Sequence, residues 1–141
     1  MARGTDPPAG SRHGLSAVGK AKAGDDSVET RRAYMPFFCG RWDDAAQTHV
    51  DVGVSERSRP MQDGFAGAGA FTPAATRPAV GRLAAPVLAY AGELDTNATP
   101  ETAATGACLF PNTTVTVQPG AAHFAWIGEP AFTAAITSFL S

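Results

Sequence analysis

The sequence predicts an α/β protein with a parallel sheet, and the last third of the chain carries that prediction. Residues Val87–Ala91 are a continuous run of mostly small apolar side chains, typical of a parallel strand covered on both faces. Residues Thr113–Gln118 alternate valine with polar side chains, which indicates a second strand. A helical pattern follows each strand, and the order strand, helix, strand, helix implies parallel pairing through right-handed crossovers.

Both helices of this unit have local signals. Thr99 can cap the N-terminus of the first, with Pro100 at its first position and Glu101 in its first turn, where an acid favours the helix dipole. Gly106 weakens this helix by about 1 kcal/mol relative to alanine. The final helix is expected over Pro130–Leu140 because its apolar side chains recur at helical spacing.

Composition divides the rest of the chain. Residues 1–28 contain no aromatic side chain and few large apolar ones, so we expect a disordered or low-complexity segment. Residues 29–80 carry an aromatic cluster and helix-forming stretches interrupted by Pro and Gly, which predicts short helices and loops. Residues 81–141 hold the strand–helix–strand–helix unit described above.

The totals exclude several classes of protein. A chain of 141 residues suits one domain, and a net charge of −2 gives no nucleic-acid footprint and no polybasic membrane patch. Cys39 and Cys108 have no disulfide-framework spacing, so we expect buried or partly buried free thiols. The N-terminus has no apolar core of a signal peptide, and no run is long enough to span a membrane. A soluble cytoplasmic protein without a cofactor is expected.

Two titratable side chains follow the two predicted strands. Asp95 comes after the first strand and His123 after the second, and functional groups gather at the carboxyl ends of such strands. A carboxylate beside an imidazole forms two members of a nucleophilic triad. Taken singly, Asp95 also suits a turn or cap, and His123 a solvated loop. His13 and His49 lie in unrelated contexts, so no metal site is expected.

These segments resemble the C-terminal portion of α/β-hydrolase fold proteins. The strand end Ala-Gly-Glu-Leu-Asp (Ala91–Asp95) resembles the one that carries the catalytic acid in that family, and Pro-Gly-Ala-Ala-His-Phe (Pro119–Phe124) resembles the turn with the catalytic histidine. The resemblance implies that Asp95 and His123 are catalytic. Phe38–Asp43 and Gly69–Arg77 are similar to the cap region of proline iminopeptidase-like and esterase members, so 29–80 would be a helical cap-like segment.

The nucleophile of that family is missing from the pattern. The family places it before the acid, on a Gly-x-Ser-x-Gly turn between a strand and a helix. The nearest candidate is Ser16 in Gly14–Gly19, where the second glycine comes one position late and no apolar strand precedes the serine. We therefore expect the C-terminal part of a hydrolase, from a truncated or mis-started reading frame, that is inactive alone.

Two function classes remain open. In the first, the intact protein hydrolyses an ester or amide, including a peptide, by a Ser-His-Asp mechanism in which Asp95 orients His123. In the second, the chain is a degenerate fragment that acts as a non-enzymatic binding module. Under either, a partner chain is expected to complete the sheet, because two strands leave edges open. A small nucleotide-binding βαβ unit is disfavoured, since no glycine fingerprint stands at a strand-to-helix turn.

Overall fold

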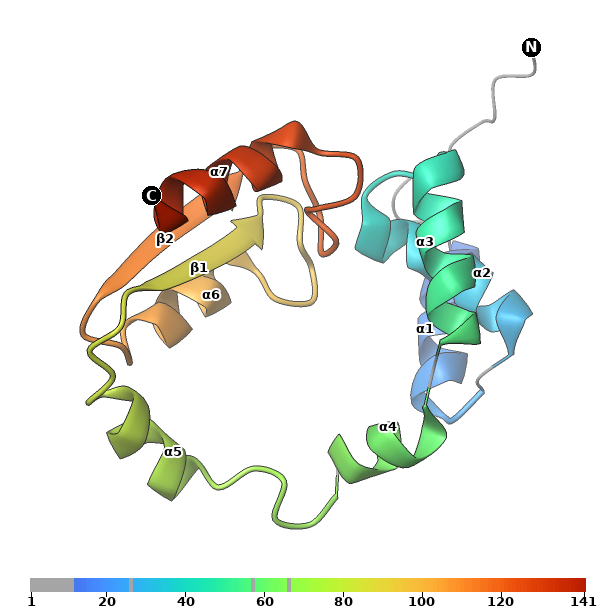
Figure 1. Cartoon of the computed structure of the whole chain (residues 1–141). Coiled ribbons are helices and arrows are strands. Elements are labelled where there is room, and N and C mark those ends of the chain that lie inside the picture. Colours follow the sequence, from blue (N-terminus) through green and yellow to red (C-terminus); the bar gives the residue numbers. More distant parts are fainter. Residues whose placement is uncertain (1–11, 26, 57, 66) are drawn as a thin grey trace.

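The computed structural model describes residues 12–25, 27–56, 58–65 and 67–141, and within these residues it holds seven helices and two parallel strands. This is a mixed α/β arrangement, as the sequence predicts (Figure 1). The elements in chain order are α1 (Arg12–Lys22), α2 (Val28–Cys39), α3 (Asp44–Ser55), α4 (Arg59–Phe65), α5 (Pro73–Val80), β1 (Val87–Gly92), α6 (Pro100–Ala107), β2 (Thr113–Gln118) and α7 (Pro130–Leu140).

The two strands form a parallel pair, which confirms the strand predictions. Val87 lies opposite Thr113 and Gly92 opposite Gln118, so the pairing runs the full length of both strands. Helix α6 connects the strands, and α7 lies on the other side of the sheet from α6 in Figure 1. Because the strands are parallel, both carboxyl ends lie at the same edge of the sheet, where the turns after Gly92 and Gln118 meet.

The helix starts follow local chemistry. The Thr99 hydroxyl accepts a hydrogen bond from the Thr102 N–H at 3.3 Å, and Pro100 opens α6, as predicted. At α3 the Asp43 carboxylate accepts the Ala46 N–H at 3.0 Å. Each of these caps satisfies a backbone donor that has no partner inside its helix.

Helix α2 ends in a tight turn next to the sheet half of the molecule. Its C-cap Gly40 has a φ of 66°, in the left-handed region, and its N–H bonds to the Pro36 carbonyl. A Cβ at this position would lie 2.7 Å from the Cβ of Ala122. Glycine therefore both ends the helix and permits close approach to the segment that carries His123.

The described part of the N-terminal segment, which the sequence predicts to be disordered or of low complexity, contains a helix. Residues 12–22 form α1, which packs against α2, whereas residues 1–11 lie outside the described residues. Gly14 and Ala17 are buried, and a Cβ at Gly14 would lie 1.9 Å from the Phe37 ring. Small side chains allow this close packing, a type of contact that a count of large apolar residues does not detect.

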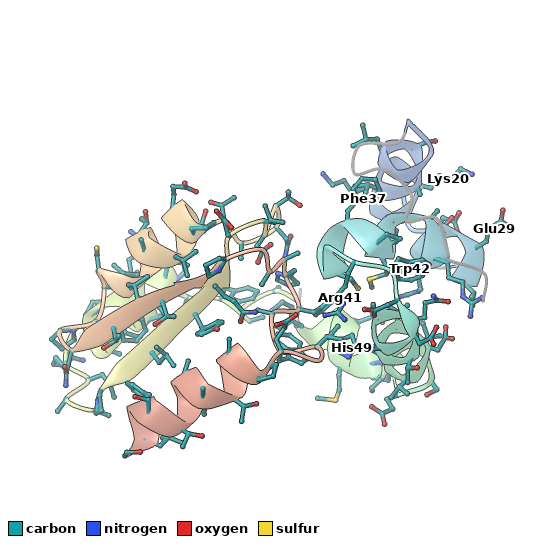
Figure 2. All side chains as sticks on the ribbon, turned by 90° about the horizontal axis from the view of Figure 1, so that it is seen from above. Lys20, Glu29, Phe37, Arg41, Trp42 and His49 are labelled. Carbon is teal, nitrogen blue, oxygen red and sulfur yellow. The ribbon has the colours of Figure 1, made fainter. Side chains whose placement is uncertain are left out.

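One hydrophobic core joins the helical half to the loop after β2. Cys39 of α2, Ala46 and Val50 of α3, and Ile127 of the loop are all buried in it. An ion pair supports the same junction, since Arg41 Nη1 lies 3.0 Å from Glu129 Oε1. Figure 2 shows Arg41 and His49 on the side of the helical half that faces the sheet half. The loop of residues 119–129 is therefore part of both halves.

The middle of the chain packs loosely. Every residue of α5 except Val80 is exposed, and Figure 1 shows α4 and α5 apart from both the sheet and the α1–α3 group.

The two cysteines differ in exposure. Cys39 is buried, but Cys108, which follows α6, is exposed, so the expectation of a buried or partly buried thiol was wrong for Cys108. No helix among the described residues is long and apolar enough to cross a membrane.

Candidate functional site

Asp95 is held in a turn directly after β1. Its N–H bonds to the Gly92 carbonyl at 3.2 Å, and its carboxylate Oδ1 accepts the N–H groups of Asn97 at 2.8 Å and Ala98 at 3.0 Å. The residue is only 6% exposed. Two backbone donors thus fix the orientation of a buried carboxylate and leave its second oxygen for another partner.

His123 supplies that partner. Its ring Nδ1 lies 2.8 Å from Asp95 Oδ2, although the residues are 28 positions apart in the sequence. The structure therefore brings together the two side chains that the sequence singled out. Because the carboxylate accepts from Nδ1–H, the lone pair of the neutral ring lies on Nε2, which has no hydrogen-bond partner among the described residues.

The backbone on both sides of His123 is held by neighbouring elements. The His123 N–H donates to the Phe38 carbonyl at the end of α2, at 2.9 Å. On the opposite side, the Leu94 N–H donates to the Ala121 carbonyl at 2.8 Å. These bonds connect the histidine loop to a helix C-terminus and to the acid loop, and so fix the separation of the Asp95 and His123 side chains.

Aromatic rings surround the imidazole on two sides. The Phe38 ring lies edge-on to the His123 ring at 5.7 Å between centroids, and Phe124 does so at 5.2 Å. The side chain of His123 keeps 30% of its surface exposed. The ring is thus confined by packing but open to a reactant, which a general base requires.

Asp95 is held in its ionised form. Burial by itself raises the pKa of this carboxyl, but the hydrogen bonds from the Ala98 N–H, the His123 ring and the Asn97 N–H together outweigh it, so the pKa is lowered. A carboxylate that is ionised across the neutral range can stabilise a neighbouring imidazolium.

Gly92 permits a close backbone approach at the site, and the sequence analysis did not single it out. A Cβ at this position would lie 2.3 Å from the Ala122 carbonyl oxygen and 2.5 Å from that of Ala121. These are backbone atoms, which cannot move aside as a flexible side chain can. A glycine at the end of a strand is a known signal of close backbone approach, and that signal was present in Ala91–Glu93.

Other candidate residues lie elsewhere. Ser16 is an exposed residue inside helix α1, not on a turn after a strand, so it lacks the geometry of a nucleophile elbow. His49 packs on Phe124 at 4.8 Å between ring centroids and has no contact with Asp95. No group of three His, Cys, Asp or Glu side chains in the described part of the chain could hold a metal ion.

We predict that Gly92→Ala destabilises the protein and separates the acid from the histidine. The new methyl group collides with two carbonyl oxygens, and overpacking of this kind costs about 1–3 kcal/mol. Urea denaturation measures the loss. Gly106→Ala is the matched control, because it lies inside α6 with nothing within 4 Å and should leave stability unchanged or raise it by up to about 1 kcal/mol. Equal stability of the two variants would contradict the close approach.

A second prediction concerns acid pH. Because the pKa of Asp95 is lowered from 3.8, its ionised form stabilises the fold fully above the unfolded value of about 3.9, and this contribution is lost as the pH falls through the lower folded pKa. The free energy of unfolding of the wild type minus that of Asp95→Asn should therefore be largest above about pH 5 and shrink as the pH falls below about 4. Urea titrations at several pH values measure it, and a difference that is constant throughout would oppose the prediction.

Comparisons with protein families and with curated proteins found no match. No protein-family model matches the chain, and no curated protein matches it significantly. The resemblance to α/β hydrolases therefore stays an expectation that rests on the residues of the two strand ends.

Proposed function

We propose that this chain is the acid–histidine portion of an α/β-hydrolase fold enzyme that hydrolyses an ester or amide in its intact form. The single observation that carries the proposal is the 2.8 Å contact between His123 Nδ1 and Asp95 Oδ2. The parallel strands and the placement of both side chains at one sheet edge are compatible with a partial fold of this kind. Asp95 and His123 are the proposed catalytic residues.

In the proposed reaction His123 moves the protons. Its Nε2 takes the proton of a serine hydroxyl as the oxygen attacks the substrate carbonyl, and Asp95 stabilises the resulting imidazolium through Nδ1–H. When the tetrahedral intermediate collapses, Nε2–H protonates the departing alcohol or amine. Water then attacks the acyl-enzyme with His123 again as the base, which releases the acid and restores the serine.

The serine and the donors of the oxyanion hole are proposed to come from outside the described residues. Strand β1 leads to the Asp95 turn and β2 to the His123 turn, so neither places a serine on a strand-to-helix turn. Ser16 is helical and exposed. The described residues hold a base and its orienting acid but no serine on a strand-to-helix turn, so the chain alone is proposed to form no acyl-enzyme.

The decisive experiment compares ester cleavage by the wild type with cleavage by variants that lack His123 or the Asp95 carboxylate. The chain alone is expected to be inactive as a serine hydrolase, but on an activated ester such as 4-nitrophenyl acetate we expect slow cleavage without a burst, because the dyad activates water directly. His123→Gln should lower the protein-dependent rate at least about tenfold, and Asp95→Asn should also lower it. His49→Gln is the matched control, since it removes a histidine with no contact to Asp95 and should keep the rate.

Two outcomes would contradict parts of this proposal. Equal rates in the wild type and in His123→Gln would remove the role of the dyad. Labelling of the chain by a fluorophosphonate probe that is lost in Ser16→Ala would show a nucleophile within the chain, and would assign that role to Ser16. The second outcome would keep the reaction class but overturn the absence of an acyl-enzyme.

A second candidate function follows from the surface of the sheet. The described sheet has two strands, and Val115 and Val117 of β2 are 44% and 41% exposed on the same face. An exposed strand edge with apolar side chains can pair with a strand of another chain. The chain would then be a binding module whose partner completes the sheet. Ester cleavage that is independent of both Asp95 and His123 would favour this function.

A further inference from the structure

A cavity of about 230 Å³ opens beside the acid–histidine pair. Asp95 and His123 form part of its wall, and the rest is apolar, with side chains from β1, α6, the histidine loop and α7. The reaction steps described above do not use this space. Its position places any group bound there in contact with the residues that would carry out the chemistry.

Three aromatic rings build one side of the cavity. Phe132 of α7 packs edge-on to Tyr90 at 5.1 Å and against Trp126 at 6.2 Å between ring centroids. The Tyr90 hydroxyl donates to Gln118 Oε1 at 2.5 Å, so its polar end already has a partner. The rings therefore offer apolar surface. Alanines, among them Ala103 of α6, also line the cavity, and their small side chains leave space for a ligand.

The cavity has no free charge to offer a ligand. Among the described residues, Asp95 is the only acidic one that lines the cavity, and no Lys or Arg lines it. Both Asp95 oxygens are engaged, Oδ1 by the N–H groups of Asn97 and Ala98 and Oδ2 by His123. A cationic group finds no carboxylate oxygen without a partner there, and an anionic group meets the field of the carboxylate. An uncharged group fits best.

We propose that this cavity binds an uncharged apolar group of the substrate, a phenyl ring or a short branched alkyl chain, beside His123. The size supports this class, because an apolar cavity of about 150 Å³ accommodates benzene, and the cavity here is moderately larger. The role in substrate binding rests on the proposed function. The affinity of the cavity for an apolar group does not depend on the proposed function.

The geometry favours a small group over an added strand. Only the carboxyl end of β1, from Tyr90 to Gly92, lines the cavity, whereas Val87, Leu88 and Ala89 do not. A pairing strand would run along the whole edge. The cavity is local to the dyad, as expected for a ligand pocket.

Benzyl alcohol, an uncharged phenyl compound, is the probe. Titrated into the full chain and followed by NMR of carbon-13-labelled alanine methyl groups, it should shift the signals of Ala103 and Ala125, which line the cavity. Ala103→Leu fills the space and should lower the affinity at least tenfold. Ala104→Leu is the matched control on the next position of α6, outside the cavity, and should bind as the wild type does. Benzoate should bind more weakly than benzyl alcohol.

A second variant covers the case in which Ala103→Leu does not fold. Trp126→Ala removes one aromatic wall from a side chain that is 47% exposed, so it should keep the fold and weaken binding. Absence of any shift in the wild type would overturn the proposal, and ester cleavage that still depends on His123 would show that the proposed function survives. Shifts along Leu88–Gly92 that grow with protein concentration alone would instead assign the cavity to a second chain.

Discussion

The site depends on the loop of residues 119–129, which is held from two directions. On the sheet side, Leu94 donates to the Ala121 carbonyl at 2.8 Å, and Gly92 lets the loop lie against the end of β1. On the helical side, the His123 N–H bonds to Phe38, and Ile127 is buried in the core with α2 and α3. The distance between the carboxylate and the ring is therefore a property of both halves. A change in either half is transmitted to the site through backbone atoms.

The same hydrogen bonds determine geometry and charge at Asp95. Burial would favour a neutral carboxyl, and the two backbone donors and the His123 ring reverse that preference and lower the pKa. Those donors also fix the direction of Oδ2, which contacts the His123 ring. The same hydrogen bonds therefore keep Asp95 ionised and orient His123. The aromatic neighbours Phe38 and Phe124 complete the arrangement, since they limit rotation of the ring without covering it.

The architecture combines a well-defined site with an open surface. Parallel sheets are stable when both faces and both edges are covered, yet the described sheet has two strands and an exposed β2. Large apolar side chains such as Leu94, Leu109 and Val115 remain at the surface near it. An additional strand would bury such surface, and within the proposed function the same addition would bring a nucleophile toward the free Nε2 of His123. The same added strand would then complete both the sheet and the site.

Local patterns by themselves determined the strands β1 and β2, the Thr99 cap and the final helix, because alternation, capping and helical spacing are properties of neighbouring residues. They also marked Asp95 and His123, since each lies in the turn or loop that follows a strand. The tertiary structure decided the rest. The packing of α1 on α2 leaves no room for a Cβ between Gly14 and Phe37, and the distance between acid and histidine depends on Gly92 and on the end of α2. Such contacts join segments far apart in the chain. They stabilise the structure only when both segments are folded against each other, so a pattern of neighbouring residues cannot predict them.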